Sequence, residues 1–383
     1  MKKVLFFIES LQCGGAEKSL VTLLSLLDYN EFKIDLILFK KGGEFEKFVP
    51  DNVSIEYVLP HKKTKSIFSF YNRIKFWVLK KLKLKKYHVA QIHWAVFKNT
   101  VPNLERWYDI AIAYNQGFAT YYVASKVLSK TKYTWLNTDY KNAGYDITFD
   151  YQFYDCYNKI VCVSKETEKS IKNELGKIGK ELPIEIIKDI SDVDFINKMS
   201  FENPGLTNYE NITKILTVGR LAKAKGYHLA LDACEILVKK GYRIKWFVIG
   251  NGPLRHEIEN MIKEKKLQEY FILLGFKENP YPFIKSCNIY AQTSLFEGLG
   301  LTVIEAAILQ KPIVTTNFPT SYSIIENEIT GLICNMNPLD IAKSIERYLN
   351  NPELNKKIVK NLSLLKNNDK EISLNKVNDL LSH

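Results

Sequence analysis

Two carboxylates and two glycines share one short stretch of the chain, FEGLGLTVIEAA, from Phe296 to Ala307. Glu297 lies in a turn after the apolar run NIYAQTSL, and Glu305 lies about one turn into the helical pattern LTVIEAAIL. Gly298 and Gly300 flank the turn. A strand, a glycine-rich turn and a helix start expose free N–H groups that bind anions. Because a carboxylate beside a phosphate must bind something else, such as sugar hydroxyls, the stretch predicts a nucleotide-sugar site. The alternative is two solvated surface acids.

A second group of residues could neutralise a diphosphate. Gly219 and Arg220 end the apolar run KILTV, and Lys225 follows five residues later, just before a helical pattern. Two cations beside a helix start stabilise a diphosphate leaving group. The alternative for both cations is ordinary surface pairing.

Glycine-containing turns follow three other expected strands. Gly14 and Gly15 come after the first strand and before the first helix, where they let the backbone approach a ligand closely. Gly250 and Asn251 end the run KWFVI, and Phe276 follows the run YFILLG. The last two turns suit nucleoside contacts, although each could be only a turn. All of these groups lie where strands end, which is where doubly wound folds bind ligands.

Alternating strand and helix patterns predict the α/β class, with parallel sheets covered on both faces. The polar segment 189–211 carries Pro204 and Gly205 and is interpreted as holding the linker between two halves. A closing helix is expected over SLNKVNDLL, residues 373–381. The expected strands cover 3–8, 33–39, 55–59, 109–114, 133–137, 159–164, 214–219, 245–250, 270–275, 288–294, 312–317 and 331–335.

Composition narrows the class of protein. A length of 383 residues predicts two or three domains. The six cysteines occur singly and without metal-like spacing, which is typical of free thiols in a reducing compartment. The first residues, MKKVLFFIES, have too short an apolar core for a signal peptide and are interpreted as a strand. No apolar run approaches the roughly 18 residues of a membrane-spanning helix.

The net charge of +12 is concentrated in one segment. Between Tyr57 and Leu104 the chain has eleven Lys or Arg and no Asp or Glu, and aromatic and aliphatic residues are interleaved with the cations. Phe70, Ile74, Trp77 and Val78 follow helical spacing. Such a basic amphipathic segment suits an anionic membrane surface. A Lys-rich helix packed on its own domain and a nucleic-acid site are the alternatives, and no nucleic-acid module supports the latter. The proposed membrane residues are Trp77, Lys80, Lys81, Lys83, Lys85 and Lys86.

The order of these motifs resembles that of the family 4 retaining glycosyltransferases of GT-B fold. The motifs are the Gly14–Glu17 turn, then VGRLAKAKG, VIGNGPL, LLGF and EGLGLTVIEA, and the resemblance extends over essentially the whole chain. It implies two Rossmann-like, doubly wound domains that face a central cleft. Residues 1–190 would form the acceptor domain, joined by a returning helix over 369–383, and residues 191–368 would form the nucleotide-sugar donor domain.

The resemblance also implies roles for single residues. Arg220 and Lys225 would contact the donor diphosphate, Glu297 the donor sugar, and Glu305 the ribose. Gly14 and Gly15 would form a loop that closes on the donor. The remaining donor-site candidates are Gly219, Gly250, Asn251, Phe276, Gly298, Leu299, Gly300, Leu301 and Thr302.

One motif departs from the family pattern. The segment TWLNTDY has Asn137 where the family usually has His, whereas Asp139 keeps its position. An amide donates and accepts hydrogen bonds but cannot become charged. Asn137, Asp139, Glu297, Arg220 and Lys225 are the candidate catalytic residues. Asn137 leaves open a rival reading, a catalytically silent subunit that binds a nucleotide sugar and supports an active partner. A second rival, a nucleotide-sugar epimerase, would need further acid/base groups in the cleft.

The expected reaction is metal-independent transfer, without a cofactor, of a hexose or N-acetylhexosamine from a nucleotide sugar. A UDP-sugar is favoured as the donor, with GDP-mannose second. The acceptor would be a lipid-linked saccharide at the inner face of the cell membrane, where the protein would be cytoplasmic and peripheral. Synthesis of a surface glycan such as capsule is the expected process.

Overall fold

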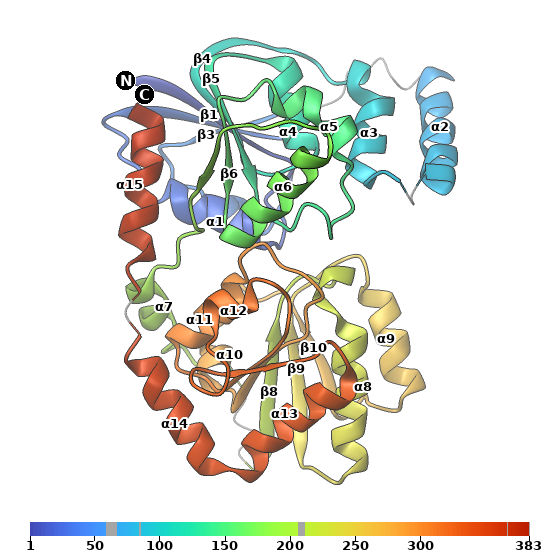
Figure 1. Ribbon diagram of the computed structural model, residues 1–383, viewed down its shortest axis with the longest axis vertical. Coiled ribbons are helices and arrows are strands. Elements are labelled where there is room, and N and C mark those ends of the chain that lie inside the picture. The colour runs from blue at the N-terminus through green and yellow to red at the C-terminus, as the bar shows by residue number, and fades with distance from the viewer. Residues whose placement is uncertain (59–66, 84–85, 206–210, 366, 383) are drawn as a thin grey trace. The chain divides into compact units, whose positions relative to one another are not determined.

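The computed structural model divides the chain into two compact units (Figure 1). Unit 1 comprises Met1–Ile190 and Glu371–His383, and unit 2 comprises Ser191–Lys370. The structure describes residues 1–58, 67–83, 86–205, 211–365 and 367–382, except for the side chains of 67–71 and 83. Within these ranges no helix is both long and apolar enough to cross a bilayer.

Unit 1 is built on a parallel sheet with the strand order β3-β2-β1-β4-β5-β6-β7 among the described residues. The inner strand β1 pairs with β2 on one side and with β4 on the other, and its residues from Val4 to Ile8 are all buried. A continuous apolar run of this kind is what burial on both faces requires. The strands are β1 (Lys2–Ile8), β2 (Phe32–Leu38), β3 (Ser54–Tyr57), β4 (Leu104–Ala113), β5 (Val127–Leu136), β6 (Lys159–Cys162) and β7 (Ile184–Ile186).

Helices cover this sheet. Helix α4 packs against β1, β4 and β5, and α6 packs against β6 and β7. Helix α15 adds the end of the chain to unit 1, where Lys376 Nζ donates to the Ile186 carbonyl at 2.8 Å. In Figure 1 helix α2 lies beyond α3, on the side away from the sheet. The helices are α1 (Gly15–Leu24), α2 (Ile67–Lys83), α3 (Val89–Phe97), α4 (Phe118–Lys126), α5 (Ile147–Tyr154), α6 (Lys165–Lys177) and α15 (Asp369–Ser382).

Unit 2 has a second parallel sheet, in the order β10-β9-β8-β11-β12-β13 among the described residues. Helices α8 and α13 pack together on a core that includes the fully buried Trp246. The strands are β8 (Thr213–Val218), β9 (Ile244–Ile249), β10 (Phe271–Gly275), β11 (Ile289–Gln292), β12 (Ile313–Thr316) and β13 (Leu332–Cys334). The helices are α7 (Val193–Met199), α8 (Tyr227–Lys239), α9 (Arg255–Glu264), α10 (Tyr281–Ser286), α11 (Leu301–Ile308), α12 (Ser321–Ile324), α13 (Pro338–Asn350) and α14 (Pro352–Ser363).

The segment 189–211 contains the boundary between the two units, which falls between Ile190 and Ser191. Asp189 is buried in unit 1, where Ser19 Oγ donates to it at 2.5 Å. In unit 2, Asp192 caps α7 by accepting from the Phe195 N–H and pairs with Lys370 Nζ at 2.6 Å. The polar residues at the start of the segment therefore anchor the chain to each unit. Residues 206–210 lie outside the described residues.

Candidate functional site

The predicted donor residues of unit 2 come together at one edge of its sheet. The loops after β8, β9, β10 and β11 all leave from the carboxyl ends of parallel strands, and the strand order reverses between β8 and β11. Such a topological switch point is where open α/β sheets bind ligands. Backbone hydrogen bonds join these loops: Leu221 N donates to the Asn251 carbonyl at 2.9 Å, and Gly250 N donates to the Gly275 carbonyl at 2.9 Å. The floor of the candidate site is therefore made of backbone from several loops.

Two glycines allow this close approach. Gly250 has φ +144°, and a Cβ there would lie 2.0 Å from the Gly219 carbonyl oxygen. Gly226 has φ +61°, and a Cβ there would lie 2.1 Å from the Thr293 carbonyl oxygen. Both positions exclude any larger residue, because the conformation and the contact each penalise a side chain.

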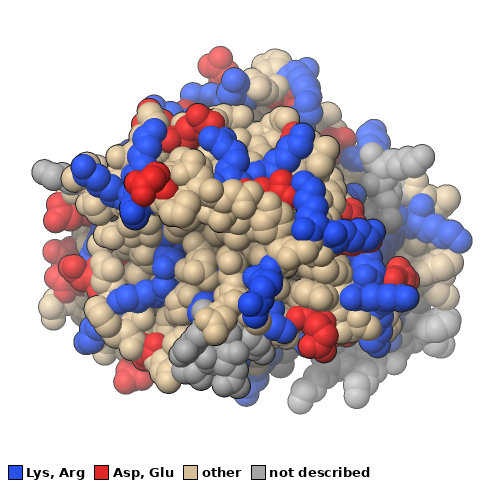
Figure 2. All heavy atoms as spheres, turned by 90° about the horizontal axis from the view of Figure 1, so that it is seen from below, with Lys and Arg blue, Asp and Glu red and all other residues tan. Residues whose placement is uncertain are grey.

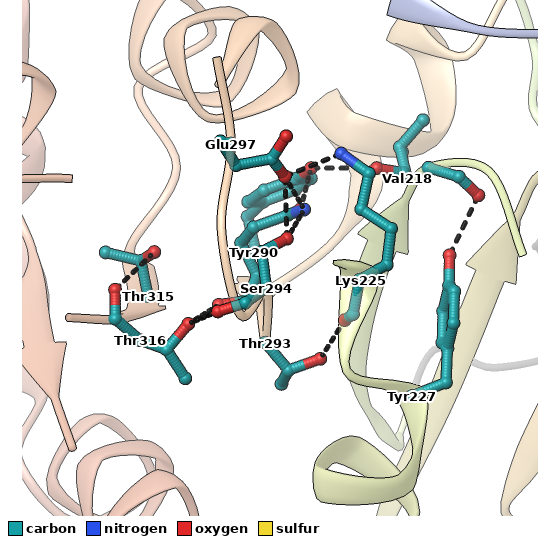
Figure 3. Close-up of polar contacts among 11 residues, drawn as sticks. Val218, Lys225, Tyr227, Tyr290, Thr293, Ser294, Glu297, Thr315 and Thr316 are labelled. Atoms are coloured by element: carbon teal, nitrogen blue, oxygen red, sulfur yellow. Dashed lines mark hydrogen bonds and ion pairs between the residues drawn. The ribbon is translucent and has the colours of Figure 1, made fainter. Parts of the chain in front are cut away.

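An ion pair joins the two groups of residues that the sequence predicted for this site, one after β8 and one after β11. Lys225 Nζ lies 2.6 Å from Glu297 Oε1, although 72 residues separate them (Figure 3). Both side chains are largely buried, at 18% and 12% exposure. Thr293 Oγ1 donates to the Lys225 carbonyl at 3.0 Å, and Leu295 N donates to the Ala224 carbonyl at 2.7 Å. These contacts fix the loop after β8 against the loop after β11, and the site holds a cation and an anion in direct contact.

The Arg220 side chain, in contrast, is exposed at the end of β8 and makes no hydrogen bond or ion pair with a described residue. Its backbone takes part in the loop, since Ala222 N donates to the Arg220 carbonyl at 2.8 Å. The Asn251 side chain accepts from the Gly252 N–H, and Phe276 follows β10 with a half-buried side chain. Arg220 is thus the exposed cation of the edge, whereas Lys225 is held by its ion pair with Glu297.

Helix α11 supplies the positive end of a helix dipole. Gly300 occupies its N-cap with φ +87° and offers no side-chain cap, so the first N–H groups, beginning with Leu301 and Thr302, remain for a ligand. Gly298 and Leu299 are buried in the preceding turn. Glu305 lies one turn into α11 and is only 3% exposed. The alternative, in which this acid is a solvated surface residue, is therefore wrong.

In unit 1, Gly14 and Gly15 lie between β1 and α1. Gly14 is the N-cap of α1 in an extended conformation, and α1 begins at Gly15. No side chain caps this end, and a Cβ on Gly14 would lie 2.0 Å from Glu17 Oε2. This turn is a second uncapped helix start, in the unit that does not contain Glu297.

Asn137 and Asp139 follow β5 in the same unit. Asn137 Nδ2 donates to the Tyr114 carbonyl at 2.8 Å, and its buried Oδ1 accepts no hydrogen bond from a described residue. Asp139 accepts hydrogen bonds from Ser170 Oγ at 2.7 Å and from the backbone and side chain of Asn142. Asp139 therefore holds its own loop, while Asn137 keeps an unused acceptor.

A cavity of about 270 Å³ opens at the carboxyl edge of the unit 1 sheet. Glu9 and Asn115, which follow β1 and β4 at the switch point of this sheet, line it together with His88, His93 and Tyr145. Further aromatic rings complete its walls. The buried Oδ1 of Asn115 accepts no hydrogen bond from a described residue. The cavity thus combines aromatic surface with polar atoms.

The sequence did not point to the two histidines of this cavity. Burial lowers the pKa of His88 to about 4, and burial and the nearby Lys40 lower that of His93. His88 Nδ1 accepts from the Ala90 N–H at 3.2 Å, and the His88 ring stacks on Tyr145 with centroids 4.0 Å apart. Both imidazoles are therefore neutral at physiological pH. His88 is the N-cap of α3, and its N–H donates to the Gln91 side chain; because a capping box usually has Ser or Thr at the N-cap, the sequence carried no clear signal for it.

Helix α2 presents the predicted apolar stripe to solvent. Of the stripe, Ile74, Trp77 and Val78 are 47%, 62% and 37% exposed, and the Phe70 side chain lies outside the described residues. Leu82, farther along the helix, is 75% exposed. The helix contacts α3 through a different face, on which Phe76 lies against His93 and Phe97. The helix therefore packs on its own unit through Phe76, and Ile74, Trp77 and Val78 are not part of that contact.

Basic side chains lie beside this stripe. Lys80, Lys81 and Lys86 are exposed, and Lys81 Nζ lies 5.2 Å from the centre of the Trp77 ring. The side chain of Lys83 and all of Lys85 lie outside the described residues. On the face drawn in Figure 2, by comparison, basic and acidic side chains of the described residues are interspersed, so that face carries no patch of one sign.

Among residues that the structure describes, no cluster of three or more His, Cys, Asp or Glu could hold a metal ion. Lys225, Arg220 and the start of α11 supply positive charge at the carboxyl edge of the unit 2 sheet.

The region that contains this edge has recognisable relatives. Residues 200–363 match the family described as glycosyl transferases, group 1. The chain is 28% identical over 323 residues to N-acetylgalactosamine-N,N'-diacetylbacillosaminyl-diphospho-undecaprenol 4-alpha-N-acetylgalactosaminyltransferase of Campylobacter jejuni, covering 83% of this chain and 81% of that protein. It is 27% identical over 205 residues to poly(ribitol-phosphate) alpha-N-acetylglucosaminyltransferase of Staphylococcus aureus. That match covers 50% of this chain and 41% of the relative, so the chain spans less than half of it.

The structure of HepE from Anabaena in complex with UDP and glucose aligns with all of this chain and 98% of its own, with a TM-score of 0.71 and 16% identity. At this identity the likeness shows the fold alone, which is GT-B: two Rossmann-like units, each with a parallel sheet. The family match and the relatives together support a glycosyltransferase of this fold.

Proposed function

We propose that this protein is a retaining glycosyltransferase, which transfers a hexose or N-acetylhexosamine from a UDP-sugar to a membrane-linked saccharide during surface glycan synthesis. The observation that carries the proposal is the Lys225–Glu297 pair at the switch point of unit 2, next to the uncapped start of α11. A nucleotide sugar carries phosphates, which a cation binds, and sugar hydroxyls, which donate hydrogen bonds to a carboxylate. The pair offers one group for each. UDP as the nucleotide is supported by the HepE complex.

The donor would lie across this edge. Its diphosphate would accept hydrogen bonds from the first N–H groups of α11, and its negative charge would be neutralised by Lys225 and Arg220. Glu305 would accept from ribose hydroxyls, and Glu297 from hydroxyls of the transferred sugar. The loops after β9 and β10, with Asn251 and Phe276, would meet the base.

The reaction would be a front-side displacement. The acceptor hydroxyl oxygen bonds to the anomeric carbon on the face from which UDP departs, and the bond between that carbon and the phosphate oxygen breaks. The departing phosphate oxygen takes the acceptor proton. Lys225, Arg220 and the helix dipole stabilise the charge that develops on this phosphate, so no step in this scheme requires a metal ion.

The acceptor would be held by unit 1, in the 270 Å³ cavity below the switch point of its sheet. Aromatic walls contact the apolar faces of a sugar ring, and polar atoms such as Asn115 Oδ1 and Asn137 Oδ1 are available to its hydroxyls. The neutral histidines His88 and His93 can each donate or accept a hydrogen bond there.

Association with the membrane would use helix α2. Its exposed apolar stripe and the flanking lysines match the interface of an anionic bilayer, into which apolar side chains insert while cations contact the head groups. This arrangement would bring a lipid-linked acceptor to the protein. The lipid-linked acceptor itself is supported by the name of the Campylobacter relative.

The test begins with a thermal-shift panel of UDP-, GDP- and dTDP-sugars. A ligand at a hundred times its dissociation constant adds about 2.7 kcal/mol of stability. The best donor is then incubated with membrane lipid extract, and UDP release and the anomeric configuration of the product are measured. Glu297→Gln should abolish transfer, whereas the exposed matched control Glu264→Gln should not. Binding without any turnover would favour the silent subunit, and an inverted product would refute the retaining mechanism.

A further inference from the structure

A chain of buried polar side chains runs along β11 and ends on Glu297 (Figure 3). Tyr290 is fully buried, Gln292 is 1% exposed and Ser294 is fully buried. A strand in this place needs only apolar residues for its stability, and a buried amide costs free energy unless it is hydrogen-bonded. These polar side chains therefore need an explanation other than the fold.

The hydrogen bonds of this chain run in one direction. Glu297 Oε1 accepts from Ser294 Oγ at 2.6 Å and from Gln292 Nε2 at 3.1 Å, in addition to Lys225 Nζ. Because a carboxylate only accepts, the nitrogen of the Gln292 amide must face it. The amide oxygen then accepts from the Tyr290 hydroxyl at 3.0 Å. Burial raises the pKa of Tyr290 well above its ordinary value, so this hydroxyl keeps its proton and donates.

The three donors all bind one of the two carboxylate oxygens of Glu297. Oε1 is occupied by three protein groups, whereas Oε2 accepts no hydrogen bond from a described residue. Lys225 is also the donor that a diphosphate would attract. When its ammonium turns to the phosphate, Gln292 and Ser294 still hold Oε1.

We propose that Gln292 and Ser294 are positioning residues, which keep Glu297 in place when Lys225 is drawn to the diphosphate and which reserve Glu297 Oε2 for the donor sugar. The inference rests on the proposed function, since it assumes that Glu297 meets the sugar and Lys225 the phosphate. It predicts that the two residues affect how the sugar is held and not how the nucleotide is bound.

The decisive variant is Gln292→Glu. At high pH the introduced carboxyl is ionised and repels Glu297, whereas at low pH it is protonated and donates a hydrogen bond as the amide does. Burial beside a second carboxylate shifts its titration toward neutral pH. Ser294→Ala removes one donor without adding charge, and Gln268→Glu, at an exposed position, is the matched control for the charge change.

Two quantities are measured from pH 5 to 8.5: the affinity for UDP alone, by calorimetry, and UDP release from the best UDP-sugar. The melting temperature of each variant is followed in the same buffers. We expect Gln292→Glu to release UDP at least about tenfold more slowly than wild type at pH 8.5, the loss of one hydrogen bond to a charged group. This ratio should recover toward one at pH 5. Ser294→Ala should lose about tenfold at every pH, and UDP affinity should change less than about threefold in both variants.

The outcomes separate the inference from the proposed function. Wild type that neither binds nor cleaves any UDP-sugar refutes the proposed function, and the inference with it. The inference alone is overturned if wild type is active but the rate of Gln292→Glu relative to wild type does not depend on pH. It is also overturned if this relative rate follows that of Gln268→Glu. The same holds if both variants lose UDP affinity in parallel with turnover. If Gln292→Glu is unfolded at high pH, unchanged turnover in folded Ser294→Ala is sufficient to overturn it.

Discussion

Removal of two apolar side chains from α2 should weaken membrane binding by an amount that the structure predicts. Trp77 and Leu82 are 62% and 75% exposed, so together they offer rather more than one fully exposed side chain to the lipid. Full burial of such a side chain contributes about 1.5–3 kcal/mol. The variant Trp77→Ala with Leu82→Ala should therefore lose about 2–4 kcal/mol of binding, or roughly thirty- to several-hundred-fold in the partition coefficient.

The assay is sedimentation with vesicles of phosphatidylcholine alone or with phosphatidylglycerol added, at several salt concentrations. The apolar contribution should persist as salt rises. Replacement of Lys80, Lys81 and Lys86 by Gln should instead remove about 1 kcal/mol for each lysine that faces the membrane, and this loss should shrink as screening grows.

A matched control lies on the same unit. Trp107 and Leu128 are 58% and 56% exposed and are neighbours on β4 and β5. Their double replacement by Ala removes the same side-chain types from a surface without the lysines of α2, and it should leave binding unchanged. Wild type that ignores anionic vesicles at low salt, or equal losses in the two double variants, would refute the assignment of α2 to the membrane.

Three further predictions concern the two units separately. Glu305→Ala should weaken UDP binding by roughly 1.5–3 kcal/mol, because a charge-assisted hydrogen bond to ribose is lost. Glu297→Ala should slow turnover and leave UDP binding nearly intact. Equal losses of UDP affinity in the two variants, measured by calorimetry, would contradict this division. UDP release should persist in excess EDTA, and rescue of a chelated, inactive enzyme by Mn²⁺ or Mg²⁺ would contradict the metal-free scheme. Burial raises the pKa of Asp150 from 3.8 to about 6, so its contribution to stability is present below pH 4 and is lost as pH rises through 6. Between pH 4 and 7 wild type should therefore lose about 3 kcal/mol more of its unfolding free energy than Asp150→Asn, as measured in urea.

The sequence predicted the strands of unit 2 closely because they are buried on both faces. Each is a continuous apolar run that stops at a polar or small residue, as KWFVIG stops at Gly250 after β9. Strand β7 was not predicted, because Ile184–Ile186 is three residues long and half-buried. Its position at the edge of the sheet beside β6, rather than its composition, makes it a strand. The start of β4 at Leu104 was missed for a similar reason, since its first residues are largely exposed.

The residues of the candidate site in unit 2 could be predicted from the sequence, but the contacts between them could not. Parallel strands bring their carboxyl ends together, so Lys225 and Glu297 could be assigned to one edge from the motifs alone. Their direct pairing depends on β8 lying next to β11, which is a property of the sheet order. The cavity of unit 1 was not predictable for the same reason, because α3 brings His88 and His93 to the sheet only through tertiary packing.

The glycines of the unit 2 edge bear on how such a protein could change its donor during evolution. Gly226 and Gly250 face carbonyl oxygens of neighbouring loops at distances that leave no room for a Cβ. A saturation scan should therefore find both positions intolerant even under selection for folding alone, without nucleotide. Their invariance would report the contact between loops and would carry no information about which sugar is used. Differences in the proposed donor would arise instead at exposed positions of these loops, such as Asn251 beside the expected base, which makes that position one to compare among relatives.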